Sequence, residues 1–165
     1  MDLVNELAEL AIATRLKRLS ERLSNDVSKI YKESDVDFEA RWFLILSILE
    51  KEKLLAITEI ADYLQLSHPA IIQLVQELEK KKLIKASVDK KDGRKRMVSL
   101  TAMGKKTLAQ IEPVLRSIKA ENKKWIDSAS ANILDILTEL EQSLTDQSMY
   151  HRIKLNILQQ KPGSC

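Results

Sequence analysis

The fold is decided by residues 58–101, TEIADYLQLSHPAIIQLVQELEKKKLIKASVDKKDGRKRMVSLT. Its first part predicts a short helix over residues 58–64, with Thr58 at the N-cap. Three apolar residues share one face of this helix: Ile60, Ala61 and Leu64. Gln65 and Leu66 make the turn that follows. The stretch therefore opens with a helix and a tight turn.

A second helix is predicted directly after this turn. Ser67 is placed to cap it, and Pro69 stands in the first helical turn, where a missing backbone donor does no harm. Four apolar residues recur on one face, which we expect to lie against the core: Ile71, Leu74, Val75 and Leu78. Two short helices joined by a tight turn form a helix-turn-helix.

The opposite face of this second helix is the candidate DNA-reading surface. With the residues at the helix start, it comprises Ser67, His68, Pro69, Ala70, Ile72, Gln73 and Gln76. In a major groove, Gln can hydrogen-bond adenine and an apolar side chain can contact a thymine methyl group. Ile72 has an equally simple alternative, as the partly buried flank of a wide apolar stripe.

The hydrophobic period changes from helical to alternating after this helix. Residues 84–88 and 97–100 are typical of the two strands of a hairpin. Residues 80–96 hold nine Lys or Arg against two Asp, a local net charge of +7, whereas the whole chain carries +3 and the remainder is therefore −4. A charge run alone usually marks a solvated face, but cations on a hairpin beside a helix-turn-helix indicate phosphate binding. The hairpin residues expected at DNA are Lys90, Lys91, Asp92, Arg94, Lys95 and Arg96.

One motif spans the hairpin and the residues after it: Asp92-x-Arg94, then Val98-x-Leu100-Thr101-x-x-Gly104. With the helix-turn-helix before it, this motif resembles the MarR family of winged helix-turn-helix regulators, through the central half of the chain. The resemblance implies a mainly α-helical fold with a small β-hairpin wing, and a DNA-binding regulator of transcription. In that family the wing arginine enters the minor groove, a role that the resemblance assigns to Arg94, with Asp92 holding its orientation.

Two positions depart from the pattern of that family. Relatives commonly have a basic residue late in the recognition helix, where this chain has Glu77, so an ionic partner for Asp92 is missing. Relatives also have a glycine before Leu83, where this chain has Lys82. Lys82 requires a helix exit without glycine, which is strained if the backbone is left-handed.

Composition predicts one domain with a real core. The chain has 165 residues, of which 44% are hydrophobic, with three Gly and three Pro. The single cysteine, Cys165, excludes an internal disulfide and a thiol metal cluster. The first thirteen residues lack the cationic start of a signal peptide, and the longest apolar run is far below the ~20 residues that span a bilayer. We therefore expect a cytoplasmic protein that does not enter the membrane.

Long helices are predicted on the N-terminal side. Apolar residues at spacings of three and four predict one helix over residues 3–30. Residues 31–37 form a polar link, and Asp37 is expected to cap a very apolar helix over residues 38–49, at the centre of the core. Residues 55–57 are expected to add a third short strand to the hairpin.

Further helices are predicted after the hairpin. The first covers residues 101–127 and continues through Pro113, with a kink or one lost backbone hydrogen bond. The second covers the apolar stripe of residues 133–144 and is expected to be capped by Ser128 or Ser130. A last, weaker helix is predicted over residues 146–160.

The predicted organisation has four parts within one structural domain. They are an N-terminal dimerisation helix at residues 1–36, a winged helix-turn-helix lobe at 37–101, C-terminal dimerisation helices at 102–160 and a flexible tail at 161–165. The flanking helices carry more apolar surface than one small lobe can cover. A homodimer would bury it and place two recognition helices roughly 34 Å apart, on a pseudo-palindromic operator. The alternative is a helical bundle within one monomer.

Enzyme signatures are absent from the sequence. His68 and His151 lie far apart, and there is no Gly-rich phosphate loop, Ser-His-Asp set or metal-ligand spacing. We therefore expect no catalytic activity, cofactor or metal. The alternative function is a winged-helix module that binds protein rather than DNA, which Glu77 and Glu79 favour and the +7 segment opposes.

The MarR resemblance also implies a small, often aromatic ligand between the dimer helices and the DNA-binding lobe. The residues placed to line such a crevice are Tyr31, Phe38, Arg41 and Trp42. Phe38 and Trp42 have an alternative role in the core. Thiol sensing, which some relatives use, is not expected because Cys165 is in the tail.

Overall fold

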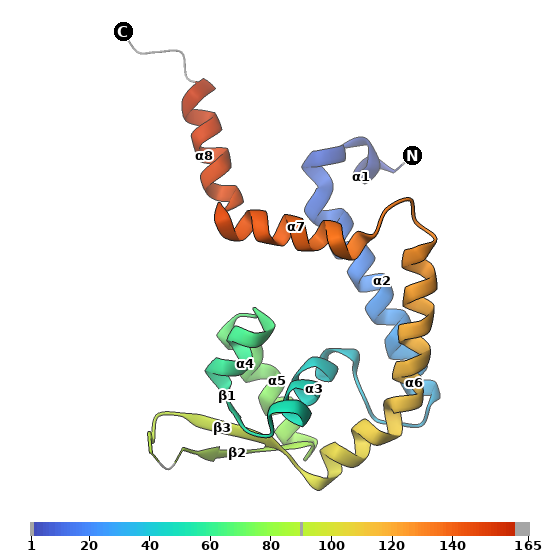
Figure 1. Ribbon diagram of the computed structural model, residues 1–165, viewed down its shortest axis with the longest axis vertical. Coiled ribbons are helices and arrows are strands. Elements are labelled where there is room, and N and C mark those ends of the chain that lie inside the picture. Colours follow the sequence, from blue (N-terminus) through green and yellow to red (C-terminus); the bar gives the residue numbers. More distant parts are fainter. Residues whose placement is uncertain (1, 90, 161–165) are drawn as a thin grey trace. The chain divides into compact units, whose positions relative to one another are not determined.

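The computed structural model describes residues 2–89 and 91–160, which form two compact units divided after Ile118. The first unit contains α1 (Leu3–Glu6), the 3-10 turn η1 (Ala8–Ala11), α2 (Ile12–Glu33), the 3-10 turn η2 (Ala40–Trp42), α3 (Phe43–Glu52), β1 (Leu55–Ala56), α4 (Ile57–Leu64), α5 (His68–Lys80), β2 (Ile84–Val88), β3 (Arg96–Leu100) and the start of α6 (Ala102–Asp127) (Figure 1). The second contains the end of α6, α7 (Ile133–Asp146) and α8 (Met149–Gln160).

The three strands form one antiparallel sheet in the order β1, β3, β2. Ile84 lies opposite Leu100 and Val88 opposite Arg96, so β2 and β3 make the predicted hairpin. Leu55 of β1 pairs with Val98, which confirms the third short strand. The predicted mainly α-helical fold with a small β-hairpin wing is therefore confirmed.

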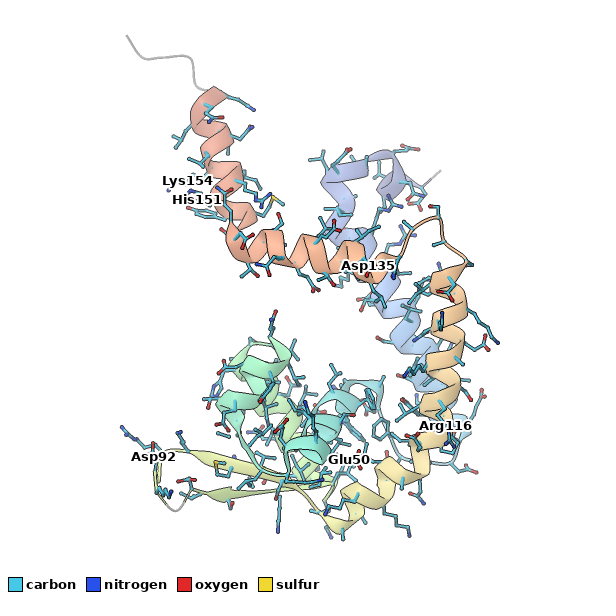
Figure 2. All side chains as sticks on the ribbon, viewed as in Figure 1. Glu50, Asp92, Arg116, Asp135, His151 and Lys154 are labelled. Carbon is cyan, nitrogen blue, oxygen red and sulfur yellow. The ribbon has the colours of Figure 1, made fainter. Side chains whose placement is uncertain are left out.

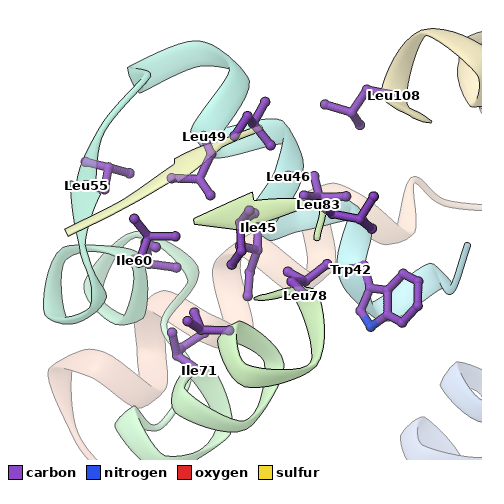
Figure 3. Close-up of a cluster of buried hydrophobic side chains, with 14 of the residues drawn as sticks. Trp42, Ile45, Leu46, Leu49, Leu55, Ile60, Ile71, Leu78, Leu83 and Leu108 are labelled. Carbon is purple, nitrogen blue, oxygen red and sulfur yellow. The ribbon is translucent and has the colours of Figure 1, made fainter. Parts of the chain in front are cut away.

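The core of the first unit lies between the sheet and the helices that pack on it (Figure 3). Its most deeply buried side chains are Tyr31, Trp42, Ile45, Leu46, Leu49, Ile60, Ile71, Val75, Leu78, Val98 and Ile111. Three of these residues come from α3, which confirms its predicted place at the centre. The predicted inward face of α5 is confirmed as well, since Ile71, Val75 and Leu78 are fully buried.

The exit of α5 is left-handed although it contains no glycine, so the conditional strain expected at Lys82 applies. Lys82 has a φ of 60°. Its N–H donates to the Glu79 carbonyl (2.8 Å), and the N–H of Leu83 donates to the Leu78 carbonyl (3.0 Å). These are the two hydrogen bonds of a Schellman motif, formed here around a lysine at a cost of roughly 1–2 kcal/mol.

The start of α6 lies against this exit. The Thr101 hydroxyl donates to the carbonyl of Lys82 (2.7 Å) and accepts from the N–H of Gly104 (3.0 Å), which caps the helix. A Cβ atom on Gly104 would lie 2.1 Å from the Leu83 carbonyl oxygen. Only glycine fits at this close approach, and α6 then continues through Pro113 as predicted.

The N-terminal region is not the single helix predicted over residues 3–30, because α1 and η1 precede the long α2. The apolar stripe is interrupted by a step of six residues from Leu10 to Leu16, which does not fit whole helical turns. Arg18 Nη1 lies 3.2 Å from Asp2 Oδ1, although sixteen residues of continuous helix would separate them by about 24 Å. The first residues therefore fold back along α2.

The predicted link over residues 31–37 and the helix over 38–49 are also wrong in their boundaries. α2 continues through Tyr31, whose ring is buried, and the next helical segments are η2 and α3. Asp37 caps neither of them, because its carboxylate pairs with Lys81 Nζ at 2.6 Å. The aromatic residues on either side of this link, Tyr31 and Phe38, are buried in the core.

Two helix caps differ from the predicted ones. At the start of α4, the N–H of Ala56 donates to Glu59 Oε2 (2.6 Å), and Thr58 lies inside the helix. At the start of α7, Asn132 accepts from the N–H of Leu134 (3.0 Å), in place of Ser128 or Ser130. In each case a polar side chain other than the predicted one, Glu59 or Asn132, accepts a hydrogen bond from a backbone N–H at the start of the helix.

In the second unit, none of the described residues of α7 or α8 is buried. Arg152 Nη2 donates to the carbonyl (2.7 Å) and hydroxyl (2.6 Å) of Ser143, which closes the turn between the two helices. Through residues 2–89 and 91–160 there is no helix with the length and hydropathy to cross a membrane.

Candidate nucleic-acid interface

The predicted reading face of α5 is present in the structure. Ser67, His68, Pro69, Gln73 and Gln76 are exposed, whereas Ala70 and Ile72 are half-buried. Ile72 packs against the core, in agreement with its alternative role as a flank of the apolar stripe. Ser67 occupies the N-cap position, but its hydroxyl caps no helical N–H in the described part of the chain. The start of α5 therefore presents short polar groups to solvent.

Glu77, near the end of this face, is held by residues from η2. Its Oε2 atom accepts from the Trp42 indole Nε1 (3.3 Å) and lies 3.2 Å from Arg41 Nη2. Its Oε1 atom accepts from Gln73 Nε2 at 3.5 Å. Only 27% of the Glu77 side chain is exposed. Sequence reasoning missed this arrangement, because Trp42 lies 35 residues away.

Glu79 is likewise engaged inside the lobe. Its carboxylate accepts from the N–H of Ala86 in β2 (3.1 Å) and pairs with Arg96 Nη2 at 2.5 Å. Arg96 thus lies in β3, away from the hairpin tip, and its charge is matched within the fold. Neither carboxylate presents a free acidic surface on α5.

The hairpin tip is organised by two aspartates. Asp89 Oδ1 accepts from the N–H groups of Lys91 (2.7 Å) and Asp92 (2.8 Å), and these backbone hydrogen bonds lower the pKa of Asp89. Asp92 Oδ1 lies 3.2 Å from Arg94 Nε, and Figure 2 labels Asp92 at the tip. The Arg94 side chain is 94% exposed, and Lys91 and Lys95 are exposed too.

Two earlier predictions lie outside the described residues. One is the DNA contact of Lys90, and the other is the tail over residues 161–165, with Cys165. Within the described part of the chain, no group of three or more His, Cys, Asp or Glu side chains is arranged to hold a metal ion.

Three of the four residues considered for a ligand crevice are buried against one another. The Tyr31 and Phe38 rings meet edge to face with centroids 4.8 Å apart, and Phe38 and Trp42 do so at 6.0 Å. Burial raises the pKa of Tyr31. Arg41 is exposed and bridges Glu39 and Glu77. Phe38 and Trp42 therefore occupy their alternative position in the core, and Tyr31 is buried beside them.

A groove of about 440 Å³ lies instead along the N-terminal segment. Its lining combines three apolar side chains, three arginines, one aspartate and one asparagine: Asp2, Asn5, Ile12, Arg15, Leu16, Arg18, Leu19 and Arg22. Sequence reasoning did not find it, because the fold-back of α1 was not foreseen.

Comparison with known proteins points to one family. A sequence model described as the MarR family matches residues 36–95. The fold is similar to that of a mutant MarR from E. coli complexed with operator DNA, with a TM-score of 0.68 and 17% identity over 87% of this chain and 99% of that chain. No curated protein matches the sequence.

Two other solved structures have the same fold. MepR from S. aureus, in a complex with DNA, has a TM-score of 0.65 and 20% identity, covering 82% of this chain and 97% of that chain. PcaV from Streptomyces coelicolor, in complex with its natural ligand, has a TM-score of 0.66 and 18% identity, covering 90% and 97%. Both likenesses extend well beyond the winged helix itself.

Proposed function

We propose that this chain, a member of the MarR family through its winged helix-turn-helix, is a sequence-specific DNA-binding regulator of transcription. α5 would lie in the major groove and the hairpin tip in the adjacent minor groove. MarR and MepR, whose folds are similar, were solved with DNA. A cytoplasmic location, shared with the DNA that it would bind, is part of the proposal.

The observation that carries this proposal is that the acidic groups of α5 have partners inside the lobe, whereas the basic groups of the hairpin tip face solvent. The carboxylates of Glu77 and Glu79 are occupied by internal partners. The cations at the tip remain exposed: Lys91, Arg94 and Lys95. A surface of exposed cations beside a polar helix start suits a phosphate backbone better than a protein partner.

A homodimer is part of the proposal, with a pseudo-palindromic operator. Its support is the exposed apolar surface outside the winged lobe, which includes Leu16, Leu23, Leu134, Ile136, Leu140 and Leu144. Large apolar surfaces of this kind mark interfaces between proteins. Sedimentation at micromolar concentration is expected to give a dimer, and a stable monomer would contradict this part.

A small-molecule effector is the third part of the proposal. PcaV was solved with its natural ligand. In this chain the groove beside α1 has a volume in the range of small-molecule sites, roughly 300–1,000 Å³. Arg15 and Arg22 would suit an anionic aromatic or aliphatic ligand, while Arg18 is paired with Asp2. The cluster of Tyr31, Phe38 and Trp42 would have to open to admit such a ligand.

The test is a selection of bound fragments from a random duplex library at near-physiological salt. A dimeric regulator should enrich an inverted repeat, with affinity that falls steeply as salt rises. Arg94→Ala should weaken binding to all sequences and reduce the salt slope by about one, while Arg116→Ala serves as the matched control. Enrichment of no sequence would favour the alternative, a module that binds protein.

A further inference from the structure

The Glu77 carboxylate is fixed in orientation by two groups that can only donate. The Trp42 indole N–H and the Arg41 guanidinium have no acceptor atom, and both meet the same carboxylate oxygen, Oε2, at 3.3 and 3.2 Å. The other oxygen, Oε1, is thereby turned toward Gln73, one helical turn earlier. Glu77 is therefore a positioned acceptor beside a candidate base-reading side chain.

This acceptor determines which end of the Gln73 amide faces inward. An ionised carboxylate only accepts hydrogen bonds, so the Gln73 group next to it must be the NH2, as the 3.5 Å contact from Nε2 to Oε1 shows. The Gln73 carbonyl oxygen then points away from Glu77. The amide of a glutamine without such a neighbour could turn over and present either end.

We propose that Glu77 is a specificity-determining positioning residue, which sets the base preference of Gln73 by fixing the orientation of its amide. The inference rests on the proposed DNA-binding function. Adenine presents a donor (N6) and an acceptor (N7) in the major groove, which match a carbonyl and the remaining amide N–H. Guanine presents two acceptors, O6 and N7, and would meet the Gln73 carbonyl oxygen unfavourably. Glu77 thus selects adenine over guanine.

The substitution Glu77→Gln is the most direct test, because it should reverse the preference of Gln73 from adenine to guanine. Arg41 and Trp42 can hold only the carbonyl oxygen of the new amide, which turns its NH2 toward Gln73. The Gln73 amide must then turn over to accept, and its own NH2 points outward. Two outward donors match the two acceptors of guanine.

The experiment is fragment selection with the full chain and four variants, at one salt concentration. The wild type should prefer adenine to guanine about tenfold at one position in each half-site. Glu77→Gln should prefer guanine at that position, and Gln73→Ala should have no preference there. Arg41→Ala, which removes one donor from Glu77 without changing α5, should reduce the preference. Glu79→Gln is the matched control, since its partners are Ala86 and Arg96, and should leave the preference unchanged.

The outcomes separate this inference from the proposed function. If the wild type enriches a motif, Gln73→Ala loses one position of it and Glu77→Gln keeps adenine there, the positioning role is overturned while DNA recognition stands. If the wild type enriches no sequence, both fail. Thermal unfolding is measured on each variant, because Glu77→Gln can alter stability as well as orientation. If Glu77→Gln does not fold, the preference of Arg41→Ala decides the matter: an undiminished preference overturns the role.

Discussion

α3 and α7 are both rich in leucine and isoleucine, but they are used in opposite ways. α3 places Ile45, Leu46 and Leu49 in the core of the winged lobe. The described residues of α7 include no buried side chain, and Leu134 and Leu140 are more than half exposed. The lobe is therefore stabilised by its own core, whereas the apolar stripe of α7 requires a surface from elsewhere. The same residue types serve folding in α3 and, in the proposed dimer, association in α7.

The largest expected effect is on the lobe. Ile45→Ala removes a fully buried side chain and should lower the free energy of unfolding by about 2–5 kcal/mol. Denaturant unfolding monitored by tryptophan fluorescence measures it. Leu44→Ala is the matched control on the same helix, because Leu44 is half exposed and should cost much less. Equal losses would mean that α3 is not the centre of the core.

A charge on α7 should act on association instead. Leu140→Lys is expected to leave the unfolding of the lobe within about 0.5 kcal/mol of the wild type, as for other surface substitutions. It should weaken the dimer at least about tenfold, since an unpaired charge would be buried in the interface. Sedimentation over a concentration series tests this. A dimer of unchanged affinity would remove α7 from the proposed interface.

The elements of the fold also differ in how well they could be predicted from the sequence. The α5 and hairpin predictions succeeded because the period changes sharply and Ser67 and Pro69 mark a helix start. The prediction of one helix over residues 3–30 was wrong because the apolar spacing is irregular after Leu10. The signal for the α7 cap was available, since Asn132 directly precedes the apolar run.

The site was less predictable than the fold. The exposed residues of α5 follow from local spacing, and the contact between Asp92 and Arg94 follows from the resemblance to the MarR family; the structure has both. The role of Glu77 depends on Arg41 and Trp42, which reach it only through the packing of η2 on α5. A single sequence carries no record of such long-range partners, and the DNA contacts themselves stay predictions.

A smaller effect is expected at the exit of α5. Lys82→Gly should raise the free energy of unfolding of the lobe by about 1 kcal/mol, because glycine adopts the observed φ of 60° without steric cost. Lys80→Gly, at the last helical residue of α5, is the matched control and should lower it by up to about 1 kcal/mol. A thermal melt of both variants measures the difference. Two variants that shift in the same direction would argue against a strained Lys82.

The smallest effect concerns alkaline pH. The pKa of Tyr31 is raised by burial, so the folded lobe keeps this proton to higher pH than the unfolded chain does. The contribution is fully present below the unfolded value of about 10 and is lost as pH rises above it. Tyr31→Phe should therefore flatten the decline of stability between pH 9 and 11, as followed by denaturant unfolding; an unchanged slope would count against burial of the hydroxyl.

The close approach at Gly104 has a consequence for how this sequence can diverge. Gly93, at the hairpin tip, has nothing within 4 Å of where a Cβ atom would lie, whereas Gly104 would place one 2.1 Å from a backbone oxygen. A library randomised at both positions and selected for a folded lobe should accept many residues at 93 and return almost only glycine at 104. The hairpin tip can thus acquire new side chains over generations, while position 104 at the start of α6 is restricted to glycine.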